Sequence, residues 1–163
     1  PILCLKHENL ISMCAICNRY FKKTNLPQLP VVHPSQVKFP IENIPITLKT
    51  LTELEIIDTN LPNEYRNYIN LMDLKERLKH PDIKTMLEDL IVAVQKQSRT
   101  KVKRDMKLSS VLKIVNDVIN DYLNDPMIEK ESFRYIRRKI LESMYDSKFS
   151  RRIAIKIHSE INN

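Results

Sequence analysis

Apolar residues recur at every third or fourth position over most of the chain from residue 46 onward. This spacing places apolar side chains on one face of a helix. It predicts helices over residues 46–57, 64–79, 82–97, 109–126, 129–145 and 149–161. No segment has a confident strand pattern and no internal repeat is present, so the sequence predicts an all-α helical bundle.

The expected core is the apolar face of each predicted helix. It comprises Leu48, Leu51 and Leu54; Tyr68, Leu71, Leu74 and Leu78; Ile83, Met86, Leu87, Leu90, Ile91 and Val94; Val111, Leu112, Val115, Val118, Ile119, Tyr122 and Leu123; Phe133, Ile136, Ile140, Leu141 and Met144; and Phe149, Ile153, Ile157 and Ile161. Asp82 is expected to cap the third helix and Ser109 or Ser110 the fourth. Short oxygen-bearing side chains accept hydrogen bonds from the free N–H groups at a helix start.

Composition divides the chain into four parts. Residues 1–26 hold all the cysteines and form a candidate zinc-binding module at the start of the chain. Residues 27–45 are rich in proline, which removes backbone donors and favours extended geometry, so they predict a semi-rigid connector. Residues 46–98 are expected to form a helical bundle. The basic linker and helices of residues 99–163 are expected to pack on that bundle.

The chain contains no glycine. Phosphate-binding loops and the sharp turns that carry nucleophiles depend on glycine, because they need positive φ or a close backbone approach. These classes of site are therefore excluded, and no nucleophile, base and oxyanion donor occur together elsewhere. We expect a protein that is not an enzyme. The apolar runs are too short to cross a bilayer, so no membrane partner is expected.

The formal net charge is +7. An excess of lysine and arginine favours a polyanionic or acidic partner, such as nucleic acid or an acidic peptide. Because the chain begins with Pro1, we also expect it to be part of a longer protein.

A cluster of metal-ligand residue types lies at the start of the chain. Cys4 and His7 are two residues apart, and Cys14 and Cys17 repeat that spacing. Structural zinc takes four nitrogen or sulfur ligands in a tetrahedron, and such pairs let one turn present two ligands to the same ion. The pattern predicts a zinc site that stabilises a segment with little core of its own.

Other interpretations of this cluster stay open. His33 could replace one of the first two ligands, since residues 14–33 begin like a classical DNA-reading zinc finger. Pro27 and Pro30 then fall where the finger's helix should be, so a base-reading helix is not expected. The cysteines could also be reduced core residues or, least favoured, a redox disulfide.

Residues 46–98 resemble a known helical family. Five features follow one another in order: a leucine-rich segment, a short isoleucine pair, a leucine before a turn, a helix ending in basic residues and His, and a second leucine-rich helix. These features lie at Leu48–Leu54, Ile56–Ile57, Leu61, Leu71–His80 and Met86–Lys96. This order resembles the N-terminal domain of transcription elongation factor TFIIS, also found in Elongin A and a Mediator subunit. Two departures are the loss of an Ile-Gly turn near residues 67–69 and Val94 in place of a Trp.

The resemblance implies a nuclear docking module that binds short segments of transcription or chromatin proteins. On this interpretation a partner peptide packs in an apolar groove, and Arg77, Lys79 and Lys84 meet its acidic flanks. Residues 130–163 are similar, more weakly, to the opening of the central TFIIS domain.

Two other functions fit the sequence. The first is DNA or RNA binding, in which basic side chains contact phosphates without choosing a sequence and Tyr20, Phe21 or Tyr135 stacks on bases. The candidate phosphate-binding residues are Lys101, Lys103, Arg104, Arg137, Arg138, Arg151 and Arg152. The second is a structural or viral helical interaction protein.

The zinc hypothesis makes a direct prediction. Protein purified without added metal should contain a stoichiometric amount of zinc by elemental analysis, because a structural site binds zinc tightly. Metal-free protein would contradict the ligand assignment to Cys4, His7, Cys14 and Cys17.

Overall fold

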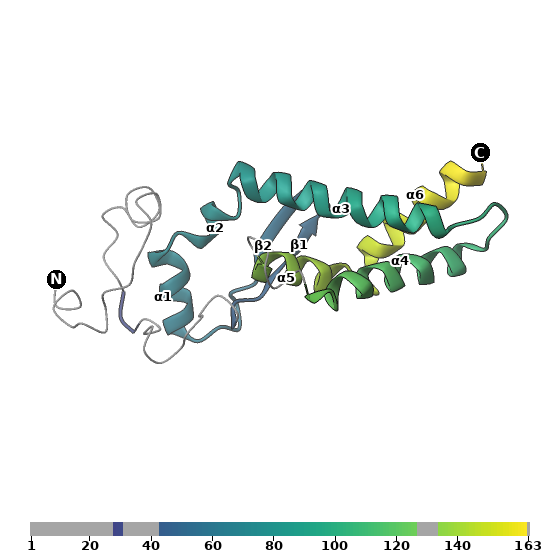
Figure 1. The fold of residues 1–163 in the computed structure, drawn as a ribbon. Coiled ribbons are helices and arrows are strands. Elements are labelled where there is room, and N and C mark those ends of the chain that lie inside the picture. The colour runs from purple at the N-terminus through teal and green to yellow at the C-terminus, as the bar shows by residue number, and fades with distance from the viewer. Residues whose placement is uncertain (1–27, 31–42, 127–133, 163) are drawn as a thin grey trace. The chain divides into compact units, whose positions relative to one another are not determined.

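The computed structural model describes residues 28–30, 43–126 and 134–162 (Figure 1). The predicted zinc module and most of the predicted connector lie outside these residues. The described part is mostly helical, with six helices and one two-stranded sheet, which confirms the helical prediction at a coarse level. Its residues fall into two compact units, which are described separately.

The small unit comprises residues 28–30, 43–45 and 55–80. Its helices are α1, Asn63–Leu71, and α2, Leu74–Arg77. Ile69 on α1 and Leu74 on α2 are buried. Lys75 on α2 donates a hydrogen bond of 2.7 Å to Asp58, and this contact lowers the pKa of the Asp58 carboxyl.

The prediction of one continuous helix over residues 64–79 is wrong. Met72 and Asp73 interrupt it, and Asp73 has φ 49°, in the left-handed region. Aspartate tolerates this conformation better than most residues because its short polar side chain can bond locally. Tyr68, Leu71 and Leu78, which were expected in the core, are only half-buried.

The predicted helix over residues 46–57 is also wrong, because this segment forms a β-hairpin. Strand β1, Ile46–Thr50, pairs with strand β2, Glu53–Ile56. In β1 the side chains of Ile46 and Leu48 are buried while Lys49 is exposed, a period of two that suits a strand. Threonine and isoleucine are frequent here, and β-branched side chains favour pleated structure over helix.

The large unit comprises residues 46–54, 81–126 and 134–162. It holds strand β1 and helices α3, Pro81–Lys101, α4, Leu108–Leu123, α5, Arg134–Met144, and α6, Lys148–Asn162. Helices α3 and α4 run side by side (Figure 1). Helix α6 packs mainly on α4, and β1 packs on α5. The predicted domain boundary after residue 98 falls inside α3.

Helix α4 supplies the centre of the large unit. Val111, Val115, Val118 and Ile119 lie at helical spacing and are fully buried. Helices α3, α5 and α6 all contact α4. Burial of apolar side chains is the main favourable term in folding, so this stripe is the principal source of stability in the unit.

The expected apolar faces of α3, α5 and α6 are confirmed for most of their residues. All six expected residues of α3 are buried, as are Ile136, Ile140, Leu141 and Met144 on α5 and Phe149, Ile153 and Ile157 on α6. The expected cap of α4 is wrong. Lys107 occupies the N-cap position without a side-chain hydrogen bond, and Ser109 and Ser110 lie inside the first turn.

We predict that Ile119→Ala lowers the free energy of unfolding by about 2–5 kcal/mol, because it leaves a cavity in a fully buried site. Ile155→Ala, on the half-exposed side of α6, serves as the control and should change it by about 0.5 kcal/mol or less. Urea denaturation of both variants checks this. Equal effects would contradict the central position of α4.

Candidate nucleic-acid interface

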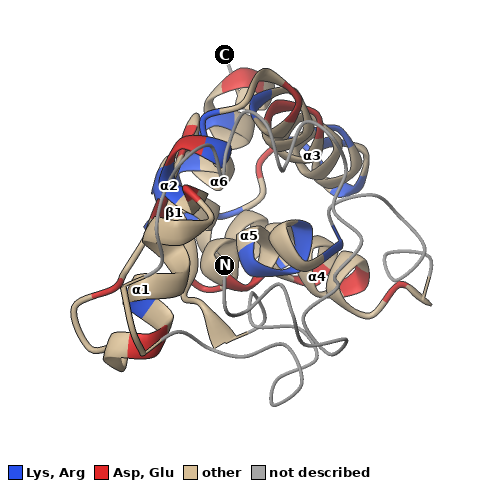
Figure 2. Cartoon of the chain, turned by 90° about the vertical axis from the view of Figure 1, so that its left-hand side faces the viewer, with Lys and Arg blue, Asp and Glu red and all other residues tan. Residues whose placement is uncertain are grey.

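The outer face of α6 is basic. Lys148, Arg151, Arg152 and Lys156 are exposed, and within the described residues none of them has an acidic partner. They lie there because Ile153 and Ile157 turn the opposite face of the helix into the core. Basic segments on α5 and α6 are visible in Figure 2. Four neighbouring cations that pair with no acid of the described residues create a positive potential that attracts polyanions.

The loop between α3 and α4, residues 102–107, extends this basic surface beyond the C-terminal end of α6. The ring Nε2 of His158 hydrogen-bonds the Met106 carbonyl at 3.1 Å, and the N–H of Asp105 donates to Asn162 Oδ1 at 3.1 Å. Both contacts tie the loop to α6. We call this loop together with the outer face of α6 the basic surface.

The loop carries three exposed lysines and arginines. Lys103, Arg104 and Lys107 are exposed and have no acidic partner among the residues that the structure describes. Asp105 has φ 67°, so the loop turns at a residue in the left-handed region. The loop therefore adds three cations and one acid, Asp105, to the surface, a net charge of +2.

Four of the seven predicted phosphate-binding residues belong to the basic surface, namely Lys103, Arg104, Arg151 and Arg152. Lys101 instead contacts Asp121 at 3.2 Å, and Arg138 contacts Glu142 at 3.3 Å.

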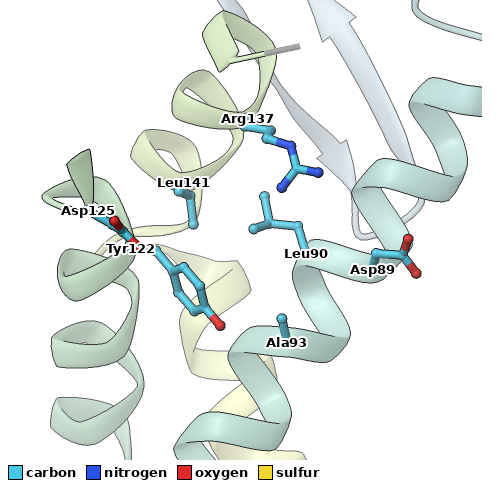
Figure 3. Close-up of a pocket in the computed structure, with 7 residues that line it drawn as sticks. All are labelled: Asp89, Leu90, Ala93, Tyr122, Asp125, Arg137 and Leu141. Carbon is cyan, nitrogen blue, oxygen red and sulfur yellow. The ribbon is translucent and has the colours of Figure 1, made fainter. Parts of the chain in front are cut away.

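The last of the seven, Arg137, lines a pocket in the large unit (Figure 3). The pocket has a volume of about 270 Å³. Its residues come from α3, α4, the segment after α4, and α5, and are Asp89, Leu90, Ala93, Tyr122, Asp125, Arg137 and Leu141. In Figure 3 the ring of Tyr122 points toward Ala93, and the carboxylate of Asp89 points away. Its lining combines three apolar residues, Leu90, Ala93 and Leu141, with charged residues, and the guanidinium of Arg137 points toward Leu90.

The predicted peptide-binding cations are already engaged within the chain. Lys79 contacts Glu76, and Lys84 contacts Glu88 at 3.9 Å. Arg77 is half-buried near Tyr68; burial raises the pKa of Tyr68, and the Arg77 charge opposes that shift. Arg77 and Lys79 belong to the small unit and Lys84 to the large unit, so the structure does not place the three on one surface.

The predicted zinc ligands Cys4, His7, Cys14, Cys17 and His33 lie outside the described residues. Within the described residues, no three His, Cys, Asp or Glu side chains gather where they could hold a metal ion. The zinc hypothesis therefore stays a prediction.

Of the predicted stacking residues, only Tyr135 is described. Its hydroxyl accepts a hydrogen bond of 2.8 Å from Arg134, whose guanidinium also lies over the ring, 4.7 Å from its centre. The ring is half-buried, so Tyr135 offers little free face to a base.

The sequence pattern did not predict two features of the basic surface. Ile155 is 48% exposed at the centre of the cations on α6. The sequence signal for this exposure was the position of Ile155 outside the buried stripe of α6, between Arg152 and Lys156. His158 and Asn162, which hold the loop, stand four residues apart on α6, but the sequence does not show what they contact.

No protein-family model matches this chain, and no curated protein or solved structure is significantly similar to it. Among the described residues, no helix combines the length and the apolar character that a bilayer-spanning segment requires.

Proposed function

We propose that the chain is a non-enzymatic nucleic-acid-binding protein, in which the basic surface contacts the phosphate backbone. The observation that carries this proposal is the outer face of α6, where four exposed cations stand together and none is paired with an acid of the described residues. Lysine and arginine that neutralise phosphates release counterions, which gives affinity that does not depend on sequence.

The rigidity of the basic surface also supports nucleic-acid binding. The cations of α6 stand on a 15-residue helix whose opposite face is buried in the core. Those of the loop stand on a segment tied to α6 by two hydrogen bonds. A surface held in place loses little conformational entropy when it binds, so more of its electrostatic attraction becomes affinity.

The test is a salt titration of binding to a fluorescent DNA duplex. Replacing Arg151, Arg152 and Lys156 together by Gln should reduce the slope of log affinity against log salt by about 3, because each lost phosphate contact removes roughly 0.9. Fluorescence anisotropy at several salt concentrations measures the slope.

A matched control replaces Lys49, Lys84 and Lys113 by Gln, which removes the same charge from exposed positions elsewhere in the large unit. The control should keep most of the wild-type slope. Equal losses in the two triple variants, or binding that salt does not weaken, would contradict the proposal.

Docking of partner proteins is a second candidate function, and the pocket favours it. At about 270 Å³ the cavity lies just below the usual size of ligand sites and suits one apolar side chain of a peptide. Asp89, Leu90 and Ala93, which line it, lie in the part of the chain that resembles the TFIIS N-terminal domain. The partners would be segments of transcription or chromatin factors, and the location nuclear.

An array of such peptide segments tests the docking function. Ala93→Leu should fill the cavity and weaken bound peptides by about tenfold or more, the effect of losing one buried side-chain contact. Val92→Leu, at an exposed neighbour on the same helix, is the control and should leave binding unchanged. Peptide binding should also persist at salt concentrations that abolish DNA binding. An array without binders would contradict this function.

A further inference from the structure

Helices α5 and α6 are joined by a turn of three residues, Tyr145 to Ser147. Asp146 has φ 44°, the left-handed region, where turns between two helices often use glycine. Its N–H donates to Asn116 Oδ1 on α4 at 3.2 Å. The turn is therefore fixed to a third helix.

The start of α6 is defined by reciprocal hydrogen bonds. The N–H of Phe149 donates to Ser147 Oγ at 3.2 Å, and the N–H of Ser147 donates to Ser150 Oγ at 3.1 Å. Such capping satisfies free N–H groups and fixes where the helix begins. The positions of Arg151 and Arg152, one turn later, follow from this start.

Helix α6 packs mainly on α4, whereas α5 packs on both β1 and α4, and the two helices contact one another only slightly. Two helices joined by a three-residue turn, both in contact with a third helix, have the connectivity of a helix-turn-helix motif. In that motif the second helix lies in the major groove of DNA, and residues of its N-terminal half contact base edges.

The outer face of α6 has the charge distribution that this position requires. At 100° per residue, Arg151 lies on one flank of the face, Arg152 and Lys156 lie on the other, and Ile155 lies between them. An α-helix with its side chains is about 10–12 Å across and the major groove about 12 Å wide. The flanking cations would thus face the phosphates on either side of the groove.

We infer that α4, α5 and α6 form a helix-turn-helix that inserts the basic face of α6 into the major groove of duplex DNA. This inference rests on the proposed function and names the ligand as a duplex. Ile155 faces the base edges, where the thymine methyl group is an apolar contact. The loop of residues 102–107 contacts the backbone beyond the end of α6.

Single strands fit the basic surface less well. Proteins that bind single-stranded nucleic acid stack bases on exposed aromatic rings. Within the described residues, the exposed positions of α6 carry no Phe, Tyr or Trp, although the exposed ring of Tyr145 lies in the turn before the helix. A duplex, which needs only phosphate and groove contacts, is therefore the better ligand.

The first test introduces a negative charge at the centre of the face. Ile155→Asp should weaken binding to a duplex of roughly 20 base pairs, about two helical turns, because the new carboxylate faces the groove. The expected loss is about tenfold or more, since like charges at an interface are strongly unfavourable. Val92→Asp, which makes the same kind of change at a 58% exposed residue of α3, should leave affinity within about twofold of wild type. Circular dichroism checks that both variants fold.

The second test blocks the major groove of the DNA. Glucose attached to 5-hydroxymethylcytosine projects into the major groove, where position 5 of the pyrimidine lies. A glucosylated duplex should bind more weakly by about tenfold, and a single strand of the same length should also bind more weakly than the plain duplex.

The outcomes separate the inference from the function on which it rests. If duplex binding is salt-sensitive but unaffected by Ile155→Asp and by glucosylation, groove insertion is wrong while phosphate binding stands. If neither duplex nor single strand binds at low salt, both are wrong.

Discussion

The structure of the large unit depends on the burial of one helix. The apolar stripe of α4, with Val111, Val115, Val118 and Ile119 fully buried, contacts α3, α5 and α6. Each of these helices must turn its own apolar face toward α4, since apolar burial is the main favourable term available to a chain of this size. The orientation of α6 follows directly. With Ile153 and Ile157 in the core, its arginines and lysines have no position except the outer face. The basic surface is therefore a consequence of core packing.

The absence of glycine constrains how the helices are joined. Three described residues have positive φ, and all are aspartates: Asp73 before α2, Asp105 between α3 and α4, and Asp146 between α5 and α6. Aspartate can adopt this conformation at moderate cost because its carboxylate bonds locally. Two of the three turns have a further support, since the N–H groups of Asp105 and Asp146 donate to asparagine side chains on α6 and α4. These contacts hold the loop and the α5–α6 turn, the two connections on which the basic surface depends.

Much of the helical architecture could be predicted from the sequence because α3, α5 and α6 have long apolar stripes of regular spacing. The hairpin could not, because Leu48, Leu51 and Leu54 are three residues apart and so fit a helical stripe; in the structure Leu51 lies in the turn between the two strands. The interruption at Asp73 was likewise invisible, since a polar residue on the outer side of a helix is ordinary. For the basic surface, the sequence identified the cations but not all of their partners. The pair Arg138–Glu142 has the four-residue spacing of a local pair on one helix, whereas the pairing of Lys101 with Asp121 on another helix is not visible in the sequence. Spatial pairing of charges between helices depends on tertiary packing, which periodicity alone does not specify.

The central claim is that the outer face of α6 and the loop of residues 102–107 form one surface for duplex DNA. Chemical-shift mapping of the isotope-labelled protein with a short duplex tests it most directly, because it reports each backbone amide separately. The account predicts that the largest shifts occur at residues 148–159 and 102–107, with small shifts in the small unit and on the exposed face of α3. Large shifts confined to the small unit or to α3, with α6 unchanged, would contradict it.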